Sequence, residues 1–152
     1  ISFWFKFVYV YNANLEKGEK NYVLAQIKKS FIPNHAAFVY EDVCKEKMWK
    51  LNSRGKLSFR FDRLGGFWNK NTEIDIVAID SVNKNLILGE CKFSNNPKGI
   101  EVLNNLRAKG QAILNEIPKG QIVSYVVFSR AGFKKNLLEL ARKNKNIVLV
   151  TG

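Results

Sequence analysis

Two carboxylates and a lysine occupy two neighbouring apolar segments of the chain. Asp75 stands in the first segment, Glu90 and Lys92 stand in the second, and the polar residues 81–85 separate them. Apolar runs joined by a short polar turn predict an antiparallel hairpin. A turn centred between residues 82 and 83 places Asp75 opposite Glu90. The residues that could do chemistry are therefore expected to meet at one end of this hairpin.

The expected surroundings of these groups are apolar. Because side chains alternate along a strand, Asp75 shares a face with Val77, and Glu90 and Lys92 share one with Leu88. Burying two carboxylates that face each other is costly, because each loses water and each repels the other. A hard divalent cation removes both penalties, and oxygen ligands suit Mg²⁺. The pattern therefore predicts a site for Mg²⁺ or Mn²⁺.

In that site Asp75 and Glu90 are the predicted metal ligands, and the backbone carbonyl of Cys91 adds a third oxygen. Lys92 would orient or deprotonate a water molecule that the metal activates. A Glu-x-Lys sequence on a strand is also common as a plain ion pair, and this interpretation stays open. The metal site and the plain ion pair differ in what a carboxylate replacement does to the stability of the metal-free protein. Replacing a repelling carboxylate costs little stability without metal, whereas breaking a buried ion pair costs several kcal/mol, about 3–5.

A fourth candidate is Glu41, in a helix predicted over residues 34–51. Cys44 and Met48 belong to the apolar stripe of that helix, and Glu41 falls within the stripe. A charge at that position indicates that Glu41 faces the sheet and assists the site. The alternative is a solvated ion pair with Lys45.

The elements that would position these groups follow from hydrophobic periodicity and turn residues. Helices are predicted over residues 19–31, 34–51, 100–117 and 133–144, with a break at Pro33. Strands are predicted over residues 57–64, 73–80, 86–93, 121–128 and 147–150, with Gly65 and Gly66 in a turn. The order α–β–β–β–α–β with an extra α–β at the end is typical of an α/β fold, a mixed sheet sandwiched by helices.

Net charge is the strongest compositional signal. The 152 residues carry 25 Lys and Arg against 13 Asp and Glu, a formal net charge of +12. Such an excess attracts polyanions, of which nucleic acid is the commonest. The candidate phosphate contacts follow the Glu-x-Lys strand or precede the last helix, and they are Lys98, Arg107, Lys109, Arg130, Lys134 and Lys135.

Other classes of function are excluded. One His and two Cys form neither a Cys/His zinc site nor a disulfide framework, and such cysteine usage indicates the cytoplasm. A His-dependent triad would have to use His35, the single histidine. The P-loop motif is missing, so the chain is not expected to bind a nucleotide in that way. No apolar run approaches the roughly 18 residues of a membrane span, so no membrane partner is expected.

The order of elements and the set Glu41, Asp75, Glu90-Cys91-Lys92 resemble the PD-(D/E)XK, or restriction-endonuclease-like, superfamily. That superfamily includes the small, basic archaeal Holliday-junction resolvases. The chain further resembles the C-terminal domain found on archaeal P-loop ATPases, a family with no settled activity. Five strings carry this likeness: Phe3-Trp4-Phe5-Lys6-Phe7-Val8-Tyr9, Tyr40-Glu41-Asp42-Val43-Cys44-Lys45-Glu46, Thr72-Glu73-Ile74-Asp75-Ile76-Val77, Gly89-Glu90-Cys91-Lys92-Phe93 and Val127-Phe128-Ser129-Arg130-Ala131-Gly132-Phe133. One departure is Ile74, which stands where the superfamily has a proline.

The resemblance implies an ATPase module on the N-terminal side, which would hold the ATP. Residues 1–18 are then expected to be a connector from that module, and residues 19–152 the nuclease-like domain. The aromatic stretch at residues 1–11 would pack on the ATPase.

These inferences predict a DNA-binding domain that hydrolyses phosphodiester bonds with Mg²⁺ or Mn²⁺. Glu41, Asp75, Glu90 and Lys92 would form its catalytic group. Two alternatives stay open. One is a catalytically inactive DNA-binding or regulatory module attached to an ATPase. The other is a protein-docking domain whose aromatic N-terminal segment is the contact surface. The sequence does not decide between DNA and RNA, or between a monomer and a homodimer.

Overall fold

The computed structural model describes residues 16–152, apart from the side chains of residues 30–32. The chain divides into two compact units, Ile1–Val39 and Tyr40–Gly152. The second unit contains the whole sheet and every residue predicted for the site. Most of the connector predicted at residues 1–18 lies outside the described residues. Within the described part, no helix combines the length and the apolarity that crossing a membrane requires.

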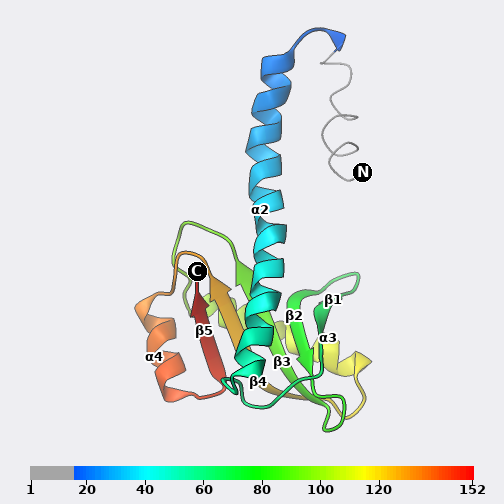
Figure 1. Ribbon diagram of the computed structural model, residues 1–152, viewed down its shortest axis with the longest axis vertical. Helices are drawn as coiled ribbons and strands as arrows, with labels where there is room; N and C mark the ends of the chain where they lie inside the picture. Colours follow the sequence, from blue (N-terminus) through cyan, green and yellow to red (C-terminus); the bar gives the residue numbers. More distant parts are fainter. Residues whose placement is uncertain (1–15) are drawn as a thin grey trace. The chain divides into compact units, whose positions relative to one another are not determined.

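A five-stranded sheet forms the centre of the second unit, in the order β1-β2-β3-β4-β5. Strands β1 to β3 pair antiparallel, whereas β3, β4 and β5 pair parallel. The strands are β1 (Arg63–Trp68), β2 (Glu73–Ile79), β3 (Asn85–Lys92), β4 (Gln121–Ser129) and β5 (Ile147–Thr151). The helices are α2 (Lys20–Ser53), α3 (Ile100–Glu116) and α4 (Lys135–Lys143). The predicted fold class and order of elements are confirmed (Figure 1).

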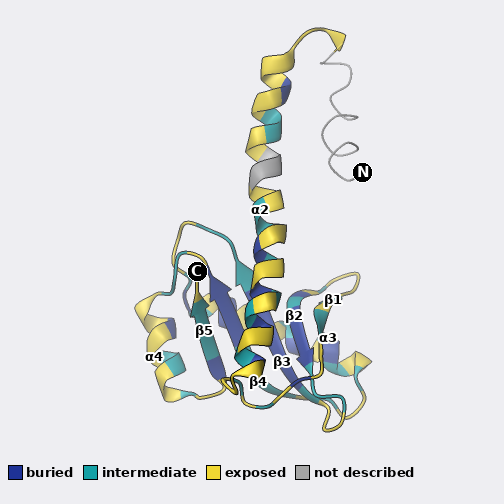
Figure 2. Cartoon of the chain, viewed as in Figure 1, coloured by how far each residue is buried: buried dark blue, intermediate teal, exposed yellow. Residues whose placement is uncertain are grey.

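Helices cover both faces of the sheet. From Tyr40 onward, α2 packs Cys44 and Met48 against Ile76 and Ile87 on one face. On the other face, α3 packs Leu106 and Ile113 against Leu86 and Leu88, and α4 packs Leu137 beside them. The buried residues gather in the central strands (Figure 2). Residues 86–90 of β3 are all buried, which is why a charge at Glu90 needs a specific partner.

The break predicted at Pro33 is wrong, because α2 is one helix through that position. A proline inside a helix removes one backbone donor and crowds the preceding turn, a local penalty of about 3 kcal/mol. The turns on either side keep their own hydrogen bonds, so the helix continues. The prediction assumed that the local cost of Pro33 is enough to end the helix.

The first predicted strand, at residues 57–64, is displaced to Arg63–Trp68. The earlier residues are apolar because Leu57, Phe59 and Phe61 pack on the α2 face of the sheet. Their alternation suggested a strand, but Phe61 pairs with a side chain. Its N–H donates to Oδ1 of Asn52 at 3.1 Å, and its carbonyl accepts from Nδ2 of Asn52 at 3.0 Å. The side-chain amide of Asn52 thus makes the two backbone hydrogen bonds that a neighbouring strand would otherwise make.

The turn predicted at Gly65 and Gly66 is also wrong, since both residues lie inside β1. Gly65 pairs with Val77 and Phe67 pairs with Ile74, so two steps along β1 match three along β2. The extra residue makes a bulge in β2 next to Asp75. A Cβ on Gly66 would lie 3.3 Å from the Asp75 carbonyl oxygen. Glycine therefore allows β1 to stay close to the bulged strand.

Candidate functional site

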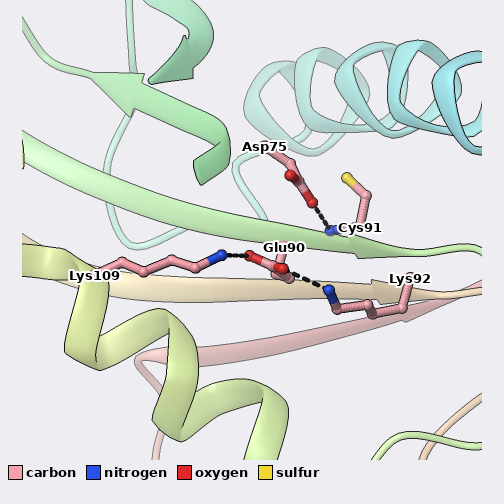
Figure 3. Close-up of polar contacts among 5 residues, drawn as sticks. All are labelled: Asp75, Glu90, Cys91, Lys92 and Lys109. Carbon is pink, nitrogen blue, oxygen red and sulfur yellow. Dashed lines mark hydrogen bonds and ion pairs between the residues drawn. The ribbon is translucent and has the colours of Figure 1, made fainter. Parts of the chain in front are cut away.

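The register predicted for the β2–β3 hairpin is confirmed. Ile76 pairs with Gly89 and Ile79 with Leu86, as a turn centred between residues 82 and 83 requires. The ladder ends at Ile76 and Gly89, one residue before Asp75 would meet Glu90. Beyond this point the Asp75 side chain takes over, because its Oδ2 accepts the backbone N–H of Cys91 at 2.7 Å (Figure 3). The site therefore forms where regular pairing of the two strands stops.

Gly89 is required by the close approach of β2 to β3 directly before the site. A Cβ on Gly89 would lie 2.8 Å from the Cβ of Ile76, closer than side-chain atoms can come. Any larger residue would push the strands apart just before Glu90. The glycine in Gly89-Glu90-Cys91-Lys92 thus has a packing reason that precedes any chemical one.

Glu90 is a buried carboxylate with two lysine partners. Its side chain is 8% exposed, Oε1 accepts Lys92 Nζ at 2.6 Å, and Oε2 accepts Lys109 Nζ at 3.0 Å (Figure 3). The two lysine side chains are 36% and 29% exposed, so both ammonium groups keep contact with water. Such charge-assisted bonds offset the cost of removing Glu90 from water.

Asp75 has no ion pair within salt-bridge distance among the described residues. Burial raises the pKa of Asp75, the Cys91 N–H bond acts in the opposite direction, and the charge of Glu90 raises it further. The net effect is a carboxylate whose pKa is above its ordinary value. The charges of Lys92 and Lys109 lower this pKa, but they do not cancel the effects that raise it.

Lys92 is held in its cationic form. Burial alone would lower the pKa of Lys92, but the hydrogen bond and negative charge of Glu90 outweigh it and raise that pKa. In the metal-free protein Lys92 is therefore a proton donor and not a base. Of the two roles expected for Lys92, orienting a water molecule agrees with this state.

Asp75 and Glu90 approach β3 from different sides. Asp75 and the Cys91 sulfur lie on the side of the strand that faces α2, whereas Glu90, Lys92 and Lys109 lie on the side that faces α3 (Figure 3). Strict alternation predicted Asp75 on the face of Val77 together with Glu90. The bulge breaks that alternation, as Ile74 shows by packing in the cluster of Val77. The two carboxylates still repel each other across the strand.

Glu41 lies on the same side as Asp75. It is half-buried on α2, and burial followed by the charge of Asp75 raises its pKa. Lys45 acts in the opposite direction, which agrees with a nearby positive charge one turn further along the helix. The structure therefore brings Glu41 towards Asp75, as its place in the apolar stripe predicted. Its role in the chemistry stays a prediction.

The thiol of Cys91 does not take part in this cluster as an anion. Its hydrogen bond with Cys44 and its burial raise the pKa of Cys91, so the sulfur stays protonated. Cys91 contributes its backbone instead, because the N–H of this residue orients Asp75. The metal contact predicted for Cys91 involves only its backbone carbonyl.

The donor set fits Mg²⁺ or Mn²⁺ in one specific way. No group of three or more His, Cys, Asp or Glu side chains arranged to hold a metal occurs among the described residues. Mg²⁺, however, is commonly held by one or two carboxylates together with water and substrate phosphate. Asp75, half-buried and without an ion pair, and Glu90, whose hydrogen bonds among the described residues come from ammonium groups, provide two carboxylates for that mode. They do not match a closed protein cage.

The predicted phosphate contacts fall into three surroundings. Lys109 is bound to Glu90, and Arg107 stacks on the ring of Tyr125 at 5.5 Å. Arg130 stacks on Phe93 at 4.8 Å and donates to the Asn95 side chain at 3.2 Å.

The remaining three basic residues lie around the start of α4. Lys98 bridges to Phe133 through its backbone, Lys134 precedes α4, and Lys135 pairs with Glu139 at 3.8 Å. The backbone bridge brings the segment before α3 beside the segment before α4. Their nucleic-acid role stays a prediction.

The second lysine on Glu90 is the functional contact that sequence reasoning missed. Lys109 was expected to contact phosphate, but its ammonium group lies against a buried carboxylate. One signal could have found it. Lys109 follows Leu106 by three positions and precedes Gly110, both buried, so it borders the buried stripe of α3.

A family model described as "Archaea bacterial proteins of unknown function" (DUF234) matches residues 4–109 of this chain. The match includes Glu41, Asp75, Glu90, Lys92 and Lys109, and ends before β4. An uncharacterized protein, MJECL04, of Methanocaldococcus jannaschii is 30% identical over 93 residues. That alignment covers 61% of this chain but only 20% of the relative, so this chain corresponds to about a fifth of that protein.

Two solved structures are similar to this chain at low sequence identity. A repair endonuclease from Pyrococcus abyssi is 8% identical with a TM-score of 0.42, covering 72% of this chain and 46% of that one. An EndoMS–dsDNA2 complex is 9% identical with a TM-score of 0.41, covering 72% and 43%. The function of this chain has to be argued from its own residues.

Proposed function

The chain belongs to the DUF234 family, and from the site that this member builds we propose a metal-dependent nuclease domain. In this proposal the Tyr40–Gly152 unit binds DNA and hydrolyses its phosphodiester bonds with Mg²⁺ or Mn²⁺. One observation carries it. A buried carboxylate paired with lysines and a second carboxylate without an ion pair lie on the two sides of β3, where β2 and β3 stop pairing. A half-buried carboxylate without an ion pair, such as Asp75, costs stability, and such perturbed groups are typical of functional sites.

Each residue has a stated role. Asp75, its carboxylate oriented by the Cys91 N–H, and Glu90 would hold the cation, together with the Cys91 carbonyl. Since the two carboxylates lie on opposite sides of β3 in the structure, sharing one cation would require their side chains to turn towards each other at the end of the paired region. A divalent cation bound there would lower the pKa of its water and neutralise phosphate charge. Lys92 reaches from Glu90 towards solvent and would position the attacked phosphate and its water. Glu41 would assist from α2 by accepting a proton beside Asp75.

DNA as the substrate rests on charge. The excess of 12 positive charges gives a field that concentrates polyanions. Exposed basic residues stand close to the site in sequence and in the fold, at Arg107 on α3 and at Arg130 after β4. Since Arg107 and Arg130 are held by stacking on rings, they are ordered before any ligand binds. Neither addresses a base, so recognition would follow shape.

For the whole protein we propose that this domain is the C-terminal part of an ATPase, as the resemblance implies. The matched 93 residues make up only 20% of that relative, which leaves room for such a module there. ATP hydrolysis by the full-length protein, abolished by replacing the P-loop lysine of that module, would support the attachment. A full-length protein without a nucleotide site would contradict it.

The decisive test of the nuclease is cleavage of plasmid, linear and branched DNA with Mg²⁺, Mn²⁺ or EDTA. Cleavage should require metal and should disappear in Glu90→Ala and Asp75→Asn. Glu116→Gln removes one exposed carboxylate at the end of α3 and serves as the matched control. Salt-sensitive DNA binding without cleavage in any of these mixtures would favour the inactive regulatory module instead.

A further inference from the structure

Each oxygen of Glu90 already accepts one lysine ammonium group in the form that the structure records. Oε1 accepts Lys92 at 2.6 Å, and Oε2 accepts Lys109 at 3.0 Å. Both bonds are to ammonium groups, which occupy the space that a cation would take and repel any cation that approaches. A divalent ion that approaches Glu90 therefore competes with these two ammonium groups.

The two lysines differ in how they are attached. Lys92 lies two residues along the same strand as Glu90, so its stem starts on the same face of β3. Lys109 comes from α3, nineteen positions further along the chain, and makes the longer of the two bonds. Its ammonium group can leave Glu90 by rotations of a long side chain that is 29% exposed, without any change in β3. Lys109 is thus the partner that can be exchanged.

We propose that Lys109 is a resident counter-cation of Glu90, which a divalent metal must displace before the site is complete. The inference rests on the proposed function. It adds a competition between Lys109 and the metal for Glu90, and a second role for Lys109 in contacting phosphate. Once displaced, the Lys109 ammonium group lies on the α3 side of the site with no carboxylate partner. A phosphate of the nucleic acid is the ligand that such a freed ammonium group fits. Metal and DNA binding are then coupled through one lysine.

This competition has a measurable sign. Removing Lys109 removes a competitor, so metal should bind more tightly to Lys109→Met than to the unchanged chain. A charge-assisted hydrogen bond of ordinary strength corresponds to about a tenfold gain in affinity. Removing a ligand or disturbing the fold would weaken metal binding instead. The direction of the change therefore separates displacement from a purely structural role.

The experiment is a calorimetric titration of the metal-free chain with Mn²⁺, without DNA. We compare the unchanged chain with Lys109→Met, Lys109→Arg and Lys143→Met. Lys143 is exposed in the last turn of α4, so its replacement controls for the loss of one positive charge. We expect about tenfold tighter Mn²⁺ binding for Lys109→Met only, with Lys109→Arg returning towards the unchanged affinity.

A second readout follows DNA binding by an uncut phosphorothioate duplex. Mn²⁺ should tighten duplex binding of the unchanged chain, and Lys109→Met should lose most of that gain while Lys143→Met keeps it. Equal or weaker Mn²⁺ binding by Lys109→Met overturns the displacement and leaves the nuclease proposal standing. Absence of Mn²⁺ binding in every variant overturns both, because the proposed metal site itself has then failed.

Discussion

The two sides of β3 give two carboxylates opposite electrostatic surroundings. On the side of α2, Asp75 lies near Glu41 and a protonated thiol, and its pKa is raised by burial. On the side of α3, Glu90 is bound by two ammonium groups. Asp75 has no ion pair among the described residues, whereas Glu90 has two. A cation completes the first side and competes on the second, so each mutation should act differently on the two sides.

The largest effect is expected at Lys92, the group that links Glu90 to solvent. Lys92→Met should keep Mn²⁺ binding but lower the cleavage rate by about a hundredfold or more, because one fixed positive charge beside the phosphate is lost. Single-turnover cleavage with Mn²⁺ titrated in parallel measures both quantities. Loss of metal binding together with cleavage would place Lys92 in the metal site itself.

Glu90→Gln should destabilise the metal-free domain, in contrast to the small cost expected of a repelling carboxylate, because the structure pairs Glu90 with Lys92 and Lys109. Two lysines would lose their counter-charge, a loss of about 2 kcal/mol once the partial exposure of both side chains is allowed for. Urea unfolding in EDTA measures it, with Glu116→Gln as control. An unchanged midpoint would mean that the two ion pairs contribute nothing.

Asp75→Asn should behave in the opposite way, keeping or gaining up to about 1 kcal/mol of metal-free stability at neutral pH. Asparagine can still accept the Cys91 N–H, and the repulsion with Glu90 and Glu41 is gone. The sign with pH follows from the raised pKa of Asp75. Below its unfolded pKa, about 3.9, the group is neutral in both states, and as pH rises through the folded pKa the unchanged chain loses stability relative to Asp75→Asn.

The measurement is the free energy of unfolding of the unchanged chain and of Asp75→Asn, each at pH 3.5 and pH 7 in EDTA. Stability that falls more steeply for Asp75→Asn than for the unchanged chain would reverse the assignment. In that case Asp75 would be a stabilising anion, with a partner that the described residues do not provide.

The smallest effect is expected far from both carboxylates. Lys135 is exposed and pairs with an exposed Glu139. Lys135→Ala therefore leaves no buried charge without its partner. It should weaken duplex binding uniformly and lower the slope of log affinity against log salt by about 1. Fluorescence anisotropy between about 50 and 200 mM salt measures this, and the unchanged chain should lose affinity steeply over that range. A duplex affinity indifferent to salt would contradict nucleic-acid binding altogether.

The sequence was sufficient for the hairpin because its signals are local. Polar residues 81–85 end one β-branched run and begin another, and one turn sets the register of Ile76 with Gly89. The same rule failed at Asp75, because the bulge arises from the pairing of β2 with β1, which the alternation of side chains within β2 does not record. It failed again at residues 57–61, where Asn52 pairs with Phe61 in place of a strand. Periodicity records burial but not which partner satisfies the backbone.

The lysine partners of Glu90 show the same limit at the site. Lys92 lies on the same strand, so alternation alone predicts its side of β3. Lys109 reaches Glu90 from a helix, and its contact depends on how α3 packs on the sheet through Leu106 and Ile113. A sequence pattern indicates which residues are buried, but it does not give the distance between two elements. The metal chemistry expected of Glu90 therefore stays a prediction, whereas its lysine partners were only partly predicted.

The central claim is that Asp75 and Glu90 bind one divalent cation together. The most direct measurement is the melting temperature of the metal-free chain, of Asp75→Asn and of Glu90→Gln as Mn²⁺ is added. A bound ion stabilises the folded state by about 2.7 kcal/mol at one hundred times its dissociation constant. The account predicts a rise in melting temperature that saturates for the unchanged chain and is absent from both variants. An equal rise in all three would contradict it.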